Sequence, residues 1–219
     1  MKSESELRAE IVAVGRLLWE RGLVGATEGN ISCRVGNLGL LCTPSGVSKG
    51  HLHPDELVLI DLHGHPLRRG LPSSEIRLHL RFFQDRPDVQ AVVHAHPPVA
   101  TAFALAHRAI PSGLLPEAVV ILGDIALCEF GMPGTDELPN SLTGNIATHD
   151  TFLLSNHGAV TTGHSVMDAF WRMETLERVA VVYAHAEQLG GAKPLPDDAV
   201  ARLNQLRVTM KSSVAPIGG

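Results

Sequence analysis

The sequence has few of the features that mark secreted, membrane or nucleic-acid-binding proteins. Its 3 cysteines include no CxxC pair, so we expect reduced thiols rather than a disulfide framework. No apolar run approaches the roughly 18 residues of a membrane span, and the N-terminal region lacks the apolar core of a signal peptide. No run of Lys and Arg occurs, and the net charge is −5, which argues against nucleic acid as a partner. These absences predict a cytoplasmic protein.

The 219 residues, 44% of them hydrophobic, are enough for a single compact domain with its own core. Hydrophobic periodicity and turn residues predict helices over 5–21, 74–85, 99–107, 137–149, 165–189 and 197–210. They predict strands over 31–35, 38–42, 57–61, 89–94, 119–122, 125–128 and 151–155. Hairpins mixed with helical crossovers indicate an α/β fold, a single three-layer α/β/α domain with a mostly antiparallel central sheet. We expect this domain over residues 1–211 and a disordered tail over 212–219.

Two segments place histidines where predicted strands end. In Val92-Val93-His94-Ala95-His96-Pro97, side chains two residues apart on a strand point the same way, so both imidazoles emerge together. His157 follows another apolar strand and precedes a glycine. Three neutral imidazoles leave a divalent ion an open coordination position, which is typical of catalytic zinc. The pair His63-Gly64-His65 has the same spacing, but it lies in a turn, and we interpret it as solvated.

Three loops combine hydroxyl or amide donors with glycines or a helix start. In Leu71–Glu75, two serines precede a predicted helix, which favours either an anion site or an ordinary helix cap. Glu75 is then either a surface carboxylate or an acid/base beside the metal. Thr27–Asn30 and Thr43–Gly46 are either phosphate-binding turns or plain turns. His79, one helical turn beyond Glu75, is expected to be a hydrogen-bonded core residue.

Taken in order, five motifs resemble the class II aldolase/adducin family, and within it the fuculose-phosphate aldolases. They are Gly29-Asn30, Thr43-Pro44-Ser45-Gly46, Pro72-Ser73-Ser74-Glu75, His94-Ala95-His96 and Asn156-His157-Gly158. The resemblance covers about residues 5–190 and implies an α/β/α domain that assembles as a homotetramer, with active sites at subunit interfaces. It also implies that His94, His96 and His157 bind Zn²⁺, with Mn²⁺ or Co²⁺ as other possible ions, and that Glu75 reaches the metal when substrate is absent.

The resemblance further implies the reaction and the roles of the loops. The substrate phosphate would be held by Gly29, Asn30, Ser45, Gly46, Ser73 and Ser74. The enzyme would reversibly cleave a ketose 1-phosphate to dihydroxyacetone phosphate and an aldehyde through a metal-stabilised enediolate. Glu75 would act as the acid/base that moves protons on and off this species.

The sequence departs from the fuculose-phosphate aldolases after its Arg108-Ala-Ile-Pro111 stretch. Those enzymes carry a tyrosine shortly afterwards that reaches a neighbouring subunit's site, and residues 112–117 contain none. Glu117 instead roughly matches the catalytic glutamate of the methylthioribulose-1-phosphate dehydratases, so it is a second candidate acid/base. That dehydratase, a ribulose-phosphate 4-epimerase and an oxo-tetronate-phosphate decarboxylase remain alternative enzymes. An adducin-like binding module without metal is the non-enzymatic alternative.

Overall fold

The computed structural model describes residues 2–214, with side chains for residues 2–210. In chain order the elements are α1 (Glu4–Glu20), β1 (Asn30–Val35), β2 (Gly39–Cys42), the short 3-10 helices η1 (Lys49–His51) and η2 (Pro54–Glu56), β3 (Val58–Ile60), α2 (Ile76–Asp85), β4 (Ala91–Ala95), α3 (Pro98–Leu105), the 3-10 helix η3 (Ser112–Leu114), the π-helix η4 (Ala118–Leu122), β5 (Ile125–Cys128), α4 (Glu137–Asn140), β6 (Thr151–Leu154), β7 (Gly158–Gly163), α5 (Val166–Gln188) and α6 (Asp197–Val214). Most of these elements fall where the sequence predicts them.

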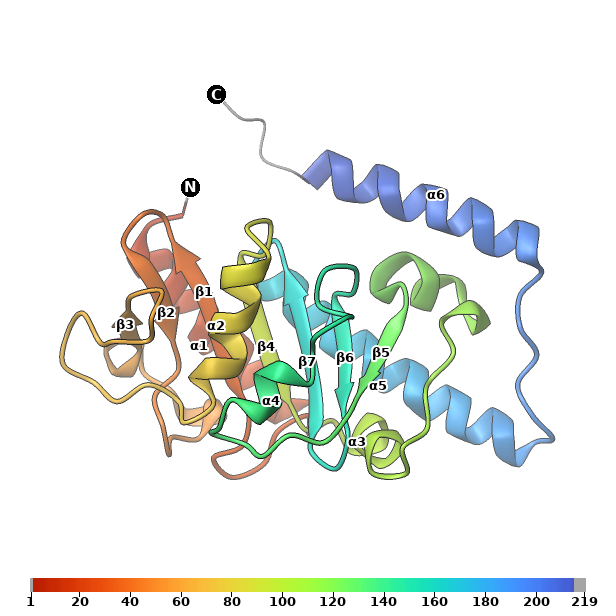
Figure 1. The fold of residues 1–219 in the computed structure, drawn as a ribbon, viewed down its shortest axis with the longest axis horizontal. Coiled ribbons are helices and arrows are strands. Elements are labelled where there is room, and N and C mark those ends of the chain that lie inside the picture. The colour runs from red at the N-terminus through yellow and green to blue at the C-terminus, as the bar shows by residue number, and fades with distance from the viewer. Residues whose placement is uncertain (1, 215–219) are drawn as a thin grey trace.

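The strands form one seven-stranded sheet in the order β3-β2-β1-β4-β7-β6-β5 (Figure 1). Every neighbouring pair is antiparallel except β5 and β6, which are parallel. The mostly antiparallel sheet is therefore as predicted.

Helices cover both faces of this sheet, and each face has its own apolar core. Residues of α1, α3 and α5 pack on one face, and residues of α2 and α4 pack on the other. In Figure 1, α2 and α4 lie in front of the sheet and α5 behind it. Successive residues of a strand point to opposite faces, so Val93 belongs to the first core and Val92 to the second. These observations confirm the three-layer arrangement.

Antiparallel pairing brings five strand ends to one edge of the sheet. β1 and β7 begin there, beside the ends of β2, β4 and β6. The register pairs Asn30 with His94 and Ala95 with Ala159. The turn between β6 and β7 lies at the same edge, at the bottom of Figure 1. Residues that are far apart in sequence are therefore neighbours at this edge.

One predicted strand is wrong. Residues 119–122 belong to η4, where the Gly123 amide donates to the carbonyl of Ala118 at 3.0 Å. Val119 and Leu122 are buried, and a short apolar run of this kind does not distinguish a strand from a buried helical turn by periodicity alone.

Two further differences concern the region before α5. The helix predicted over 137–149 ends at Asn140 in α4 and is followed by turns that include Gly144 at a φ of 95°. A residue at positive φ cannot continue a right-handed helix. No prediction covers β7, which begins and ends with a glycine and contains the buried Thr161 and Thr162. Because both faces of β7 are buried and two of its residues are threonines, the sequence shows neither an apolar run nor the apolar–polar alternation that would predict a strand.

The last helix, α6, packs on η4 through Arg207, which donates to the carbonyl of Leu122 at 3.1 Å. It continues through Val214, so residues 212–214 are helical and do not belong to the tail predicted from Ser212. The rest of that tail, 215–219, lies outside the described residues. Within residues 2–214, no helix combines the length and apolar character needed to cross a bilayer.

The packing predicts a strong dependence of stability on Phe152. Its ring is fully buried and meets the buried ring of Phe82 edge-on, with centroids 5.1 Å apart. Phe152→Ala is expected to lower the free energy of unfolding by about 3–5 kcal/mol, because it leaves a cavity between sheet and helix. Phe130 is 49% exposed, so Phe130→Ala should change it by less than about 0.5 kcal/mol. Urea unfolding measures both values, and equal losses would contradict this account of the core.

Candidate metal centre and anion loops

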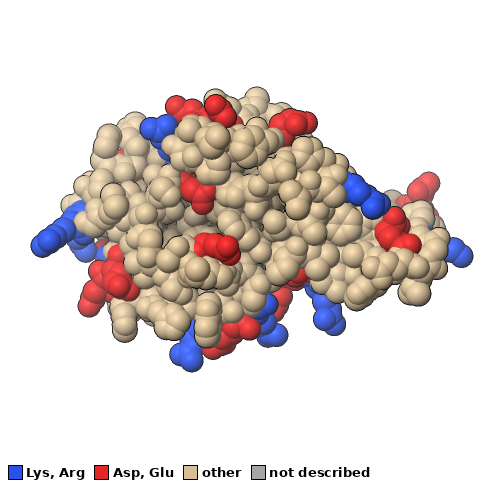
Figure 2. Space-filling model, turned by 90° about the horizontal axis from the view of Figure 1, so that it is seen from below, with Lys and Arg blue, Asp and Glu red and all other residues tan. Residues whose placement is uncertain are grey.

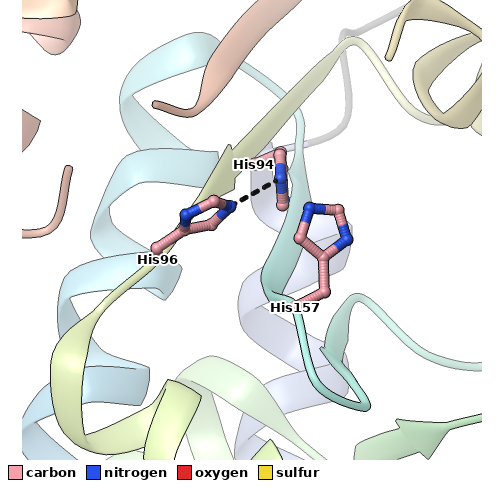
Figure 3. Close-up of side chains that lie close together, drawn as sticks. All are labelled: His94, His96 and His157. Carbon is pink, nitrogen blue, oxygen red and sulfur yellow. Dashed lines mark hydrogen bonds between the residues drawn. The ribbon is translucent and has the colours of Figure 1, made fainter. Parts of the chain in front are cut away.

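Three histidines converge at the edge of the sheet described above. His94 lies near the end of β4, His96 follows it two residues later, and His157 lies in the turn between β6 and β7 (Figure 3). Their ring centroids are 4.8 to 5.2 Å apart, and their possible ligand nitrogens all lie within 4.8 Å of one another. The predicted convergence of this histidine trio is confirmed.

The glycine that follows His157 is needed for this close approach. A Cβ atom on Gly158 would lie 2.5 Å from Cδ2 of His96 and 2.7 Å from the carbonyl oxygen of Ala95. Any larger residue would therefore push the His96 ring away from the other two. The glycine noticed in the sequence makes room for one of the candidate ligands.

Glu75 lies against the trio from the loop before α2. One carboxylate oxygen, Oε2, is 3.3 Å from Nε2 of His94, and the other, Oε1, is 3.1 Å from Nε2 of His157. Burial alone would raise the pKa of Glu75, but the imidazoles of His157 and His94 outweigh it and hold the pKa well below its usual range. The carboxylate is therefore ionised at neutral pH.

A chain of hydrogen bonds fixes the position of this carboxylate. The side-chain amide of Asn30 donates to Oε2 of Glu75 at 2.9 Å, and its oxygen is bonded to Nε2 of His79. Nδ1 of His79 lies 2.5 Å from the hydroxyl of Ser32. Burial, followed by the charge of His94, lowers the pKa of His79 to about 3, so His79 is neutral. His79 is thus a hydrogen-bonded core residue, as predicted.

The surroundings of the trio suit a divalent cation. Nδ1 of His94 lies 2.9 Å from the carbonyl of Ala159, and donation to this carbonyl leaves the Nε2 lone pair facing the centre. Oε1 of Glu75 lies 3.1 Å from Nε2 of His157 but accepts no hydrogen bond of good geometry, and the buried Nδ1 of His157 has no hydrogen-bond partner among the described residues. Imidazole nitrogens with a nearby carboxylate are ligands that Zn²⁺ and similar ions accept. The residues present therefore fit a metal ion of this class.

The other histidine pair with the same spacing does not join this centre. His63 and His65 are exposed, and His65 lies 3.1 Å from the carboxylate of Asp61. Within residues 2–214, the trio is the group of His, Cys, Asp and Glu side chains whose ligand atoms come close enough for a metal. The interpretation of the pair as solvated turn residues is confirmed.

The three loops predicted to hold phosphate, residues 27–30, 43–46 and 71–75, are called the anion loops here and adjoin one another beside the trio. The amide of Ser73 donates to the carbonyl of Thr43, and the amide of Ser45 donates to that of Leu71, both at 3.1 Å. Gly46 has a φ of 73°, and a Cβ there would meet nothing within 4 Å. The backbone of this turn is thus open to a ligand.

The remaining residues predicted to hold phosphate differ in their exposure and in the hydrogen bonds that they already make. Ser74 is exposed, and Ser73 is buried with its hydroxyl accepting from the amide of Glu75 at 3.3 Å. The side-chain amide of Asn30 is already bonded to Glu75 and His79. Gly29 has a φ of 70°, and a Cβ there would lie 2.8 Å from the carbonyl of His94. Contact of these residues with a phosphate stays a prediction.

Glu117, the second candidate acid/base, does not join the histidine trio and Glu75. It is an exposed residue at the start of η4, and no contact between it and the trio or Glu75 is found among the described residues. Sequence reasoning missed a different carboxylate, Glu28, whose Oε2 lies 3.8 Å from Nδ1 of His96. Its position in the loop just before β1, next to the predicted Gly29 and Asn30, is the signal that could have identified it.

The chain is similar to several proteins of known family over most of its length. A sequence model described as "Class II Aldolase and Adducin N-terminal domain" matches residues 9–184. An L-fuculose phosphate aldolase from Methanococcus maripaludis is 35% identical over 171 residues, which are 78% of this chain and 92% of the relative. A 5-methylthioribulose-1-phosphate/5-deoxyribulose-1-phosphate aldolase from Rhodospirillum rubrum is 34% identical over 201 residues, 92% of this chain and 90% of the relative.

A relative with a different reaction also matches. A 3-oxo-tetronate 4-phosphate decarboxylase from Haemophilus influenzae is 32% identical over 177 residues, 79% of this chain and 84% of the relative. Among solved structures, an L-fuculose 1-phosphate aldolase superposes with a TM-score of 0.86 at 29% identity, and the match covers 94% of this chain and 97% of that one. The predicted resemblance and fold are both confirmed.

The geometry of the trio predicts which histidines bind metal. His94→Ala and His157→Ala should each lose most of the bound divalent ion, because three nitrogens are needed to hold it. His63→Ala and His65→Ala are the matched controls and should retain the wild-type metal content. Elemental analysis of the dialysed proteins measures this content. A full complement of metal in His157→Ala would contradict the assignment.

Proposed function

The chain belongs to the class II aldolase and adducin family, and we propose that it is a zinc-dependent aldolase that reversibly cleaves a ketose 1-phosphate to dihydroxyacetone phosphate and an aldehyde. The observation that carries this proposal is the position of Glu75, which faces the histidine trio and adjoins the anion loops. A sugar phosphate held by its phosphate group would present its carbonyl to that centre.

A divalent ion held by His94, His96 and His157 would supply a Lewis acid for the carbonyl, an effect worth several kcal/mol of barrier. Other residues of the chain would orient the groups that act on the substrate. The carbonyl of Ala159 keeps the His94 ring in place. Asn30 and His79 hold the Glu75 carboxylate in one orientation, so that it needs little rearrangement to reach a proton on the substrate.

The proton balance gives Glu75 its role. Cleavage of the C3–C4 bond leaves the electron pair on C3, while the hydroxyl on C4 loses its proton and becomes the aldehyde carbonyl. C3 must then receive a proton. The ionised carboxylate of Glu75 would remove this proton in the direction of synthesis; in the direction of cleavage Glu75 would first take up a proton from solvent and then deliver it to C3. The base that takes the C4 hydroxyl proton corresponds to the tyrosine that residues 112–117 lack.

The phosphate would lie between the three loops that adjoin the trio. Gly46 leaves its backbone accessible, and Ser74 is exposed at the approach to α2. Exposed backbone N–H groups and hydroxyls next to a helix start are suited to a phosphate oxygen. With the phosphate fixed there, the carbon chain of a ketose 1-phosphate would extend toward Glu75.

Two observations favour a substrate with a less polar aldehyde end, such as a 5-deoxy- or 5-methylthio-ribulose 1-phosphate. The relative that acts on such compounds matches 92% of this chain. Leu114 and Leu115, in the region that lacks the tyrosine, line an apolar groove of about 330 Å³ against α5. In a homotetramer with sites at subunit interfaces, this region would face a neighbouring copy's site.

The decarboxylase relative supports a second candidate reaction on a phosphorylated 3-oxo acid. A panel experiment separates the two: zinc-loaded protein is incubated with ketose 1-phosphates, with pentulose 5-phosphates and with a 3-oxo-tetronate 4-phosphate. We expect dihydroxyacetone phosphate from the ketose 1-phosphates, measured by a coupled dehydrogenase assay. Release of carbon dioxide, or interconversion of pentulose phosphates without cleavage, would contradict the aldolase proposal. No turnover and no bound metal would support an adducin-like binding module.

A carboxylate replacement tests the acid/base. Glu75→Gln should lower kcat by about 100-fold or more, because an amide cannot exchange the proton, while the protein still binds metal through the trio. Glu117→Gln is the matched control and should retain most of the wild-type kcat. Near-normal turnover in Glu75→Gln together with loss in Glu117→Gln would transfer the acid/base role to Glu117.

A further inference from the structure

One ammonium group is buried beside the anion loops. Lys49 is only 2% exposed and begins η1, which packs under α1. The packing is tight, because a Cβ on Gly15 of α1 would lie 2.6 Å from the carbonyl oxygen of Lys49. A buried charge is unfavourable unless hydrogen bonds or opposite charges compensate it. Lysine is seldom fully buried, so its place here calls for an explanation.

The ammonium group connects two of the anion loops. Nζ of Lys49 donates to the carbonyl of Thr27 at 2.8 Å and to that of Val47 at 2.5 Å. Thr27 lies two residues before Gly29, and Val47 directly follows Gly46. A single side chain therefore holds together the turns that contain the two predicted phosphate-binding glycines.

The residues predicted to hold phosphate bring no positive charge of their own. The residues predicted to hold phosphate are Gly29, Asn30, Ser45, Gly46, Ser73 and Ser74, and none of them is basic. Figure 2 views the molecule from below, onto the edge that carries the site. Among the described residues visible in this view, Lys and Arg lie around the rim, while acidic side chains lie both at the rim and nearer the middle. The field from such a surface would oppose a phosphate dianion, and a buried cation would offset it.

We propose that Lys49 is a positioning residue that holds the 27–30 and 43–47 loops together and supplies the positive potential that favours a phosphate dianion between them. This inference rests on the proposed function. It concerns a residue that does not touch the reacting atoms and acts through the loops that it joins.

Because Lys49 can lose its charge, the inference predicts that anion binding depends on pH. Burial lowers the pKa of Lys49 to about 8, and the carboxylate of Glu75 raises it in part. On the neighbouring elements, the uncharged Gly15 of α1 meets the carbonyl of Lys49, and Trp19 of α1 packs on Gly50 and His51. His51 is the titratable side chain of η1 next to Lys49, and its Nδ1 lies 3.2 Å from the hydroxyl of Ser48. Lys49 is thus charged below about pH 8 and loses its charge as the pH rises through that value.

The test measures the affinity of zinc-loaded protein for sulfate, which stays a dianion between pH 7 and pH 9. Calorimetric titration should show wild-type affinity about fivefold weaker at pH 9 than at pH 7, because a small charged fraction of Lys49 persists at pH 9. Lys49→Met should bind about tenfold more weakly at pH 7 and lose the pH dependence. Lys49→Arg stays charged at both pH values and should bind equally at both. Lys193→Met, which alters an exposed lysine, should behave like the wild type.

Several outcomes would overturn the inference. One is wild-type affinity and pH dependence in Lys49→Met. Another is a fall between pH 7 and pH 9 that persists in Lys49→Arg, because it would belong to another group. Lys49→Arg decides the case if Lys49→Met does not fold, as judged by its melting curve. In turnover, Lys49→Met should raise KM and leave kcat nearly unchanged, whereas general misfolding would lower kcat.

A double variant separates this inference from the proposed function. Ser73→Ala with Ser74→Ala should weaken sulfate binding if the anion site lies between the loops. If this double variant and Lys49→Met both bind sulfate normally, the proposed anion site is wrong. If the double variant weakens binding while Lys49→Met does not, the anion site stands and only the role of Lys49 is overturned.

Discussion

The candidate site depends on the antiparallel pairing of β4 with β1 on one side and with β7 on the other. The register that sets Asn30 opposite His94 and Ala95 opposite Ala159 brings every candidate ligand to one edge. A slip of one residue would turn the side chains of a strand to the opposite face, so His94 would enter the wrong core. Val92 and Val93 are fully buried, one on each face of the sheet, so β4 is held between two apolar cores and carries its histidines at the end of the strand.

The charged groups Glu75 and Lys49 are each compensated by polar neighbours on other elements of the fold. Glu75 is a partly buried carboxylate that meets His94 and His157 on one side and the amide of Asn30 on the other. Lys49 is a buried ammonium with two carbonyl acceptors. Unpaired charges in these positions would destabilise the fold, so the same contacts that support the fold also orient the groups proposed for chemistry. Stability and function are coupled at this edge.

The sequence alone predicted the histidine trio, but it did not predict the buried contacts that surround it. The alternation of a strand placed His94 and His96 on one face, and a strand-end glycine pointed to His157, so the metal centre could be predicted. The bonds that join His79 to Asn30 and to Ser32 could not, because they depend on how α2 packs on the sheet. Lys49 was missed for a similar reason: nothing local in its sequence distinguishes a buried lysine from a solvated one. The strand expected over 119–122 failed because a buried apolar run satisfies either geometry.

The relatives catalyse different reactions, and the chemistry explains how one centre serves them. Cleaving the C3–C4 bond of a ketose and removing carbon dioxide from a 3-oxo acid both leave an electron pair on a carbon next to a carbonyl group. Both then need a proton delivered to that carbon. The proposed cation site, the proposed acid/base Glu75 and the proposed phosphate loops would meet these shared needs, so none of them would distinguish the reactions. The difference must arise where the departing fragment lies, since an aldehyde leaves only after its hydroxyl loses a proton, whereas a carboxylate leaves without one. Residues 108–117, where this chain lacks the aldolase tyrosine, are therefore the part of the sequence in which specificity is to be sought.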